Sequence, residues 1–199
     1  MTTMDTQNAT FNIKQYDSYD LTRGFLPKQD PLKNLPTEFA AWDEAAYALP
    51  KLFVSRHVRQ TIQGLPEFPV HLLQNDAELE RAMLILSYLG HAYVWCTLNN
   101  PVNRLPSIIA RPWYEVAKKL RRPPVLSYPS YALYNWYRLD KNQPPMLGNI
   151  ALLQNFLGGI DEEWFILVHI DIERLAAPGL RALNKIYDLV PNKDVEAIT

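Results

Sequence analysis

The 199-residue sequence contains one cysteine, seven glycines and no long apolar run. Cys96 alone can form neither an internal disulfide nor a cysteine-based zinc site, which is typical of a reducing compartment. No apolar run approaches the roughly 18 residues of a membrane span, and the polar N-terminus lacks the features of a secretory signal. The formal net charge of -1 argues against nucleic acid or an anionic membrane as the main partner. We therefore expect a soluble cytoplasmic protein.

Motifs for several kinds of catalysis are also missing. The sequence has no Gly-rich phosphate loop, no HExxH and no GxSxG, so nucleotide hydrolysis, zinc proteolysis and α/β-hydrolase chemistry have no support. The four histidines are far apart, and no two of them have metal-ligand spacing on one helix: His57, His71, His91 and His169. Residue types alone therefore predict no metal site.

The composition is that of a folded globular protein, with 48% hydrophobic, 12% aromatic and 21% charged residues. Sixteen prolines against seven glycines indicate many stiff breaks between short segments. The pattern predicts a mostly α-helical chain without a βαβ pattern or an internal repeat. The length suits one full domain, or a small domain and part of a second.

Residues 1–36 have little periodicity and are expected to form an extended arm that packs through Tyr16, Tyr19, Phe25 and Leu26. Thr37 and Asp76 are predicted to cap the helices that begin there. Residues 127–138 are expected to begin as an extended turn and to continue as a helix. Helices are predicted over residues 37–50, 51–63, 76–98, 106–122 with a kink at Pro112, 149–157, 161–177 and 180–190.

His169 is the unusual histidine, because it lies in an apolar run over residues 164–170. Phe165 is one helical turn before it on the same face. A lone imidazole among apolar side chains implies either an internal hydrogen-bond partner, for which Glu173 is a candidate, or a cavity with a polar ligand. We interpret His91 as a half-buried histidine bonded to a neighbour, and His57 and His71 as surface residues.

Several segments, in conserved order and spacing over nearly the whole chain, resemble the indoleamine 2,3-dioxygenase family of haem enzymes. The most specific are PPVLSY at 123–128, LYNW at 133–136 and WFILVHIDIE at 164–173. The resemblance implies an all-α fold in which a small N-terminal domain lies over a larger helical domain that holds the haem. It divides this chain into an arm at 1–36, a small helical domain at 37–159 and the start of the large haem-binding domain at 160–199.

The resemblance also implies an activity. Family members use haem b to insert both atoms of dioxygen across the C2–C3 bond of the tryptophan indole, which gives N-formylkynurenine in the kynurenine pathway of tryptophan catabolism. The partners implied are therefore an indole substrate and dioxygen.

By position, Tyr128, Tyr131 and Ala132 match residues that wall the distal pocket beside the substrate. Phe165 matches the aromatic residue that packs on the indole. His169 matches the polar position above the iron, which is serine in the vertebrate enzymes, and a histidine there could donate a hydrogen bond to dioxygen or to the substrate. Because Tyr131 and His169 are bulkier than their vertebrate counterparts, the pocket is expected to be narrower, which leaves a substrate other than tryptophan open.

Two functional residues of the family, the proximal histidine on the iron and the arginine that binds the substrate carboxylate, come later in its chain than Thr199. We therefore expect no metal ligand in this chain, which resembles an N-terminal half completed by a C-terminal segment or a second polypeptide and is inactive alone. Two alternatives stay open. One is a non-catalytic helical interaction module with an exposed apolar face on residues 164–177, and the other is a haem oxygenase for another aromatic substrate.

Overall fold

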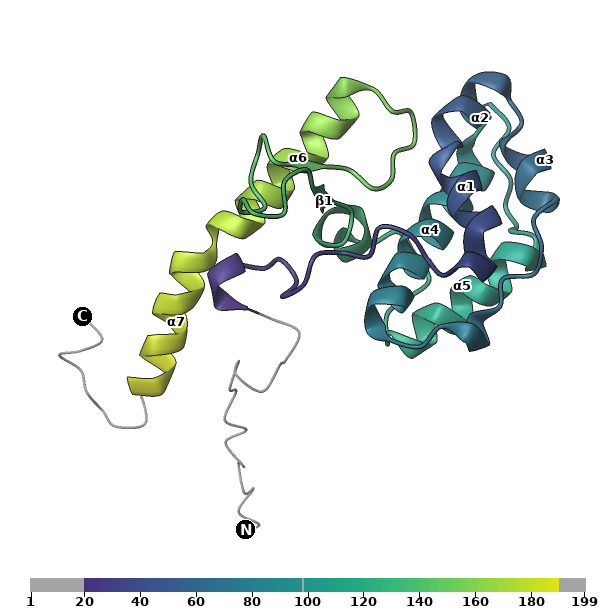
Figure 1. The fold of residues 1–199 in the computed structure, drawn as a ribbon. Helices are drawn as coiled ribbons and strands as arrows, with labels where there is room; N and C mark the ends of the chain where they lie inside the picture. Colours follow the sequence, from purple (N-terminus) through teal and green to yellow (C-terminus); the bar gives the residue numbers. More distant parts are fainter. Residues whose placement is uncertain (1–19, 98, 190–199) are drawn as a thin grey trace, which may run out of the picture.

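The computed structural model describes residues 20–97 and 99–189. It is mostly helical, which confirms the all-α class, and its described strands form a single short antiparallel pair (Figure 1). In this pair β1 (Tyr137–Arg138) bonds to β2 (Ile150–Ala151), with Tyr137 opposite Ala151.

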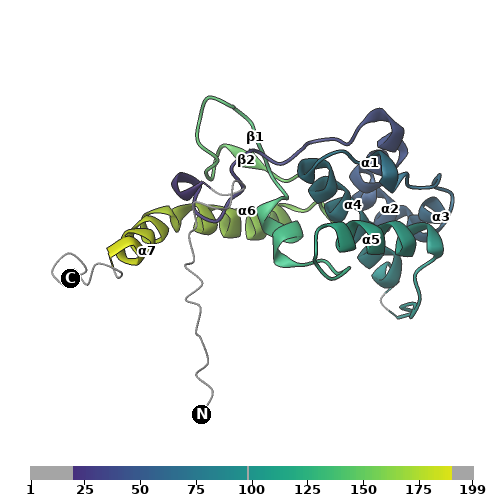
Figure 2. The same cartoon turned by 90° about the horizontal axis from the view of Figure 1, so that it is seen from below.

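Short helices surround one long buried helix to form a helical body (Figure 2). The central helix is α4 (Asp76–Trp95), whose residues from Arg81 to Gly90 are all buried. It packs against α1 (Ala40–Tyr47), α3 (Val58–Gln63) and α5 (Ser107–Lys119). The remaining elements of this body are η3 (Thr37–Phe39), α2 (Leu49–Ser55) and η4 (Val70–Leu72).

The closest approach between α4 and α5 depends on a glycine. A Cβ atom on Gly90 would lie 2.6 Å from Cζ3 of Trp113, and two further atoms of the same indole lie within 3.2 Å. Trp113 is only 5% exposed. The tryptophan ring of α5 therefore packs directly on the backbone of α4.

A second, smaller core forms where four segments meet beside the helical body. The elements are the π-helical turn η5 (Pro129–Leu133), β2, α6 (Ile160–Leu175) and the arm. Beyond α6 the chain continues into α7 (Ala177–Leu189), and these two helices extend away from the helical body (Figure 2). The buried side chains of this core are Leu26, Ala132, Trp136, Ile150, Leu152, Ile166, Leu167 and Ile170.

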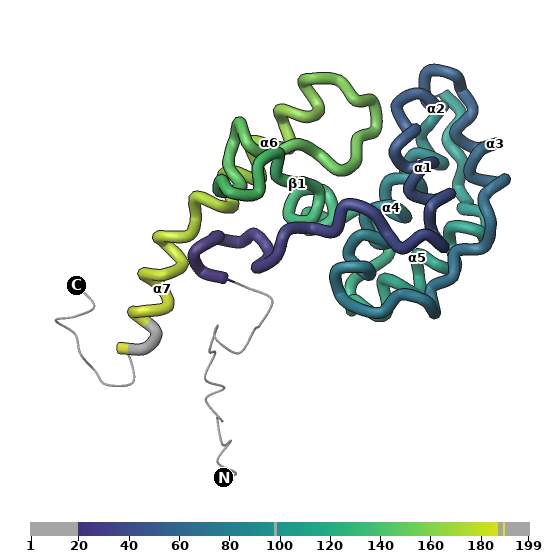
Figure 3. The backbone as a smooth tube through the Cα atoms, in the orientation of Figure 1, coloured from purple at the N-terminus to yellow at the C-terminus, as the bar shows by residue number. Residues whose placement is uncertain are grey.

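The arm runs from α7 past α6 to the helical body, as the purple tube shows (Figure 3). Its short helix η2 (Leu21–Arg23) packs on α7, and Leu26 is fully buried. The Phe25 backbone N–H donates to the Glu173 carbonyl oxygen at 3.0 Å. Gly24 has φ of 66°, and a Cβ there would lie 2.0 Å from that oxygen, so this contact requires glycine. Packing through Leu26 is confirmed, whereas Phe25 is 42% exposed and binds through its backbone. Tyr16 and Tyr19 lie outside the described residues.

Several predicted boundaries are wrong. The helix predicted over 37–50 is divided, because η3 opens with Pro36 at its cap and α1 ends at Tyr47. The helix predicted over 51–63 is divided at Arg56, whose left-handed φ of 61° ends α2. The cap of α4 is Asn75 rather than Asp76, since the Asn75 side chain accepts from the Glu78 N–H at 3.0 Å. The turn at 129–133 does not continue as a helix to residue 138, because a short loop at 134–136 follows it and leads into β1.

The helix predicted over 149–157 is also wrong, since these residues form β2 and a loop. The Asn149 side chain explains the difference. Its Oδ1 accepts from the Asp140 N–H at 2.8 Å, and its Nδ2 donates to the carbonyl oxygens of Asp140 and Pro144 at 2.9 Å each. These bonds hold a hairpin loop in place of a helical turn.

Within residues 20–97 and 99–189, no helix is both long and apolar enough to cross a membrane. Leu98 and residues 190–199, which include the predicted ends of two helices, lie outside the described residues. The predicted domain boundary at residue 160 stays a prediction.

Candidate functional site

The candidate site is built on α6, whose start is fixed by an acidic side chain. The Glu162 carboxylate accepts hydrogen bonds from the backbone N–H groups of Phe156, Leu157 and Gly158 at 2.7–2.9 Å. Acidic side chains at this end also suit the positive end of the helix dipole. The helix buries Ile166, Leu167 and Ile170 against η5 and the arm, so its opposite face is open.

Phe165 and His169 lie one turn apart on α6, as their spacing predicts, with ring centroids 4.6 Å apart. His169 Nδ1 is 2.6 Å from the Phe165 carbonyl oxygen. Because a carbonyl only accepts, Nδ1 carries the proton and donates. In a neutral imidazole Nε2 is then the acceptor. The internal partner of His169 is therefore the Phe165 carbonyl, and the expectation that Glu173 fills this role is wrong.

Tyr128, the residue that caps the start of η5, reaches the same place. Its ring centroid is 6.5 Å from that of His169, edge to face, and its hydroxyl donates to Glu173 Oε1 at 2.7 Å. Burial and the hydrogen bond to the carboxylate both raise the pKa of Tyr128 above its usual value. Tyr128 stays protonated and points its hydroxyl at Glu173. Sequence reasoning missed this pair, because no local signal links residues 45 positions apart.

Tyr131 and Ala132 lie on η5, beneath the open face. Ala132 is fully buried in the second core. Tyr131 is half-buried and packs against both hydrophobic cores, and burial, followed by the nearby Glu162 carboxylate, raises its pKa. The structure therefore brings Tyr128, Phe165 and His169 together at the surface and places Ala132 inside.

The other histidines behave as predicted. His91 is half-buried, and its Nε2 accepts from the Leu126 N–H at 3.2 Å, which only an unprotonated nitrogen can do. Burial lowers the pKa of His91. His57 and His71 are exposed.

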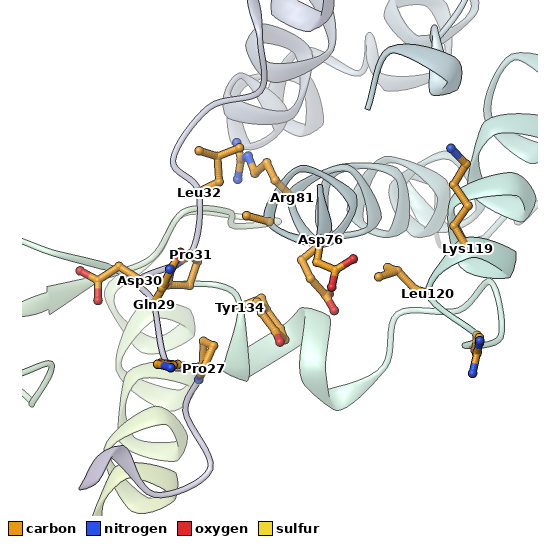
Figure 4. A pocket seen from close by; sticks show the side chains of 14 residues that line it. Pro27, Gln29, Asp30, Pro31, Leu32, Asp76, Arg81, Lys119, Leu120 and Tyr134 are labelled. Atoms are coloured by element: carbon orange, nitrogen blue, oxygen red, sulfur yellow. The ribbon is translucent and has the colours of Figure 1, made fainter. Parts of the chain in front are cut away.

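The face around Phe165 is apolar and open, as predicted for residues 164–177. Phe165 is 58% exposed, and further large apolar side chains of α6 are exposed to a similar extent: Trp164, Ile172 and Leu175. The five site residues line neither of the described cavities, the larger of which lies between the arm and α4 (Figure 4). Within residues 20–97 and 99–189, no group of three or more histidine, cysteine, aspartate or glutamate side chains is placed to hold a metal ion.

Comparison with known proteins identifies the family to which these segments belong. The family model described as "IDO: Indoleamine 2,3-dioxygenase" matches residues 13–199. The chain is 32% identical over 169 residues to indoleamine 2,3-dioxygenase 1 of Rattus norvegicus, covering 84% of this chain and 42% of the relative. It is 34% identical over 176 residues to indoleamine 2,3-dioxygenase of Saccharomyces cerevisiae, covering 82% and 39%. The chain therefore belongs to the indoleamine 2,3-dioxygenase family.

A further relative carries a different substrate in its name. The 6-hydroxytryptophan 2,3-dioxygenase fscD of Fusarium equiseti is 32% identical over 173 residues, covering 86% of this chain and 42% of the relative. In each of these comparisons the chain spans less than half the length of the relative.

Proposed function

We propose that this chain forms part of a haem dioxygenase that cleaves the C2–C3 bond of tryptophan, or of a substituted tryptophan, to the N-formylkynurenine product. Family membership supports the class of reaction. The observation that carries the site is the meeting of Phe165, His169 and Tyr128 on one open face of α6. An aromatic wall with one imidazole suits a flat indole that carries a single N–H group.

The same face fits one side of a haem site. Its exposed aromatic and aliphatic side chains suit an apolar macrocycle, and His169 presents an imidazole nitrogen there. When bound, haem supplies the iron that activates dioxygen. We propose that the proximal histidine, and the arginine that binds the substrate carboxylate, come from a C-terminal segment or a second chain.

The tautomer of His169 sharpens its proposed role. Because Nδ1–H donates to the Phe165 carbonyl, neutral His169 accepts at Nε2 and has no proton to give there. We therefore assign it as the acceptor for the indole N–H, in place of the donor to dioxygen or to the substrate that the resemblance suggests. Phe165 packs on the ring, and Tyr128 closes the edge beside His169 while Glu173 holds its hydroxyl.

The test uses the complete protein: this chain together with the sequence encoded downstream of Thr199. That sequence is expected to encode a helical segment with a histidine and an arginine in the family's positions. The reduced haem protein is expected to convert tryptophan or 6-hydroxytryptophan to a product that absorbs in the near ultraviolet. His169→Ala and Phe165→Ala are expected to raise KM for the indole substrate, while the exposed control His57→Ala keeps the activity. A complete haem protein that cleaves neither substrate would refute the proposed reaction.

A haemin titration tests whether this chain alone contains the iron ligand. The chain alone is expected to give no tight stoichiometric complex in the Soret band, with or without tryptophan. A tight complex would show that these 199 residues already contain the iron ligand.

The exposed apolar face of α6 also favours a second function, that of a non-catalytic interaction module. A stop codon directly after Thr199, with no second chain in the purified assembly, would favour this alternative. A chain that binds its partner through α6 should then lose the partner, but not its fold, when Trp164 is replaced by Glu.

A further inference from the structure

The larger of the two described cavities is separate from the α6 face and has the properties of a small-molecule site. Its volume is about 600 Å³, within the range of roughly 300–1,000 Å³ that is typical of such sites. Pro27 and Gln29 of the arm lie on one side and Leu120 at the end of α5 on the other, with Asp76 and Tyr134 between them (Figure 4). Its apolar walls suit a ring or a short aliphatic chain.

Two of its three acidic residues are already paired with arginines that do not line it. Asp30 bonds to Arg23 at 2.8 Å and to Arg138 at 2.6 Å. Glu80 forms an ion pair with Arg122. The third, Asp76, is the first residue of α4, where the helix dipole offsets part of its charge.

Some of the basic side chains that line the cavity have no hydrogen-bond or ion-pair partner among residues 20–97 and 99–189. The side-chain nitrogens of Lys119 and Arg121 have no hydrogen-bond or ion-pair partner within the part of the chain that the structure describes, whereas Lys28 interacts electrostatically with the Asp20 carboxylate. The lining therefore carries two unpaired positive charges against one unpaired negative charge. Such an excess favours an anionic ligand.

Arg81 is buried behind this wall. Its Nε and Nη2 donate to Asp43 Oδ1 at 3.1 and 2.7 Å, and its side chain is only 4% exposed. The remaining nitrogen, Nη1, is buried with no partner among the described residues. Figure 4 shows the side chain extending toward Leu32 of the arm. Because Nη1 has almost no accessible surface, Arg81 supports the cavity wall from behind and does not itself contact a ligand.

From these observations we infer that this cavity binds a small organic carboxylate, with its apolar body between the arm and Leu120 and its carboxylate among the basic side chains. This site is independent of the proposed dioxygenase reaction, and its test requires neither haem nor turnover.

The test measures binding of benzoate to the full chain by isothermal titration calorimetry, with benzamidine and inorganic phosphate as comparison probes. Benzoate is expected to bind with a stoichiometry of one, and more tightly than either comparison probe. Benzamidine has the same ring with a positive group, and phosphate has the negative charge without a ring. Binding of benzamidine or phosphate as tight as that of benzoate, or no binding of benzoate, would overturn the inference.

Two variants locate the site. Arg121 has a left-handed φ of 55°, which glycine adopts without strain, so Arg121→Gly removes the charge and keeps the fold. Arg121→Gly and Lys28→Gln are each expected to weaken benzoate binding about tenfold, as for the loss of one charge-assisted contact. The control is Lys118→Gln, an exposed neighbour that does not line the cavity and should leave binding unchanged. Equal affinities for all three variants and the wild type would place the benzoate elsewhere and refute the assignment.

Discussion

Gly90→Ala tests the packing of α5 on α4. The added methyl would lie 2.6, 3.0 and 3.2 Å from three atoms of the Trp113 indole. These distances are shorter than van der Waals contact, so the buried indole ring would have to move away from α4. Overpacking of this kind lowers the free energy of unfolding by about 3 kcal/mol at the upper end of its usual range. The higher helix propensity of alanine raises it by about 1 kcal/mol. We expect a net loss of about 2 kcal/mol, or a Tm lower by about 4–8 °C for a chain of this size.

The assay is urea unfolding followed by far-ultraviolet circular dichroism. The control is Gly179→Ala in α7, where a Cβ meets nothing within 4 Å, and this change should stabilise the protein by about 0.5–1 kcal/mol. In a Trp113→Leu background, which removes the indole, Gly90→Ala should cost clearly less than in the wild type. The packing argument fails if Gly90→Ala matches the wild type in stability, or if its cost is the same in both backgrounds.

Three further predictions concern polar contacts. Asp43→Ala leaves the buried Arg81 guanidinium without its anion, and should lower the unfolding free energy by about 3–5 kcal/mol in urea titrations. Burial lowers the pKa of His91 in the folded protein, so its contribution to stability is complete above about pH 6.5 and is lost as the pH falls through the folded pKa. His91→Ala should therefore flatten the loss of stability below that pH, and an unchanged slope would contradict the assignment. Glu173→Gln should lower the pKa of Tyr128 in an ultraviolet titration, with Tyr128→Phe identifying its signal.

The parts of the fold that sequence reasoning predicts best are the long periodic helices. α4 and α6 have apolar residues at helical spacing and acidic first turns, and each was located to within three residues at either described end. The break at Arg56 was not predicted, because a left-handed conformation is usually adopted by glycine or asparagine and arginine gives no such indication. The hairpin at Asn149 escaped because its side chain bonds to backbone groups several residues away.

The candidate site divides in the same way. The contact of Phe165 with His169 follows from their four-residue spacing on one helix. The contacts of Tyr128 with His169 and Glu173 join residues on different elements, and spacing says nothing about them. The tautomer of His169 follows from a carbonyl on its own helix, but only the ring orientation in the structure reveals it.

The attachment of the arm has a consequence for how the chain acquires its structure on the ribosome. Arg181 donates to the Leu21 carbonyl oxygen, 160 residues away, and Leu26 belongs to the core that α6 completes. The helical body contains its own core and can assemble while later residues are still being synthesised. The arm is made before the helical body, yet its binding surface on α6 and α7 is made after that body. Until then Leu26 is exposed and Gly24 has nothing to pack against, so the arm reaches its native contacts later than the helical body that follows it in the sequence.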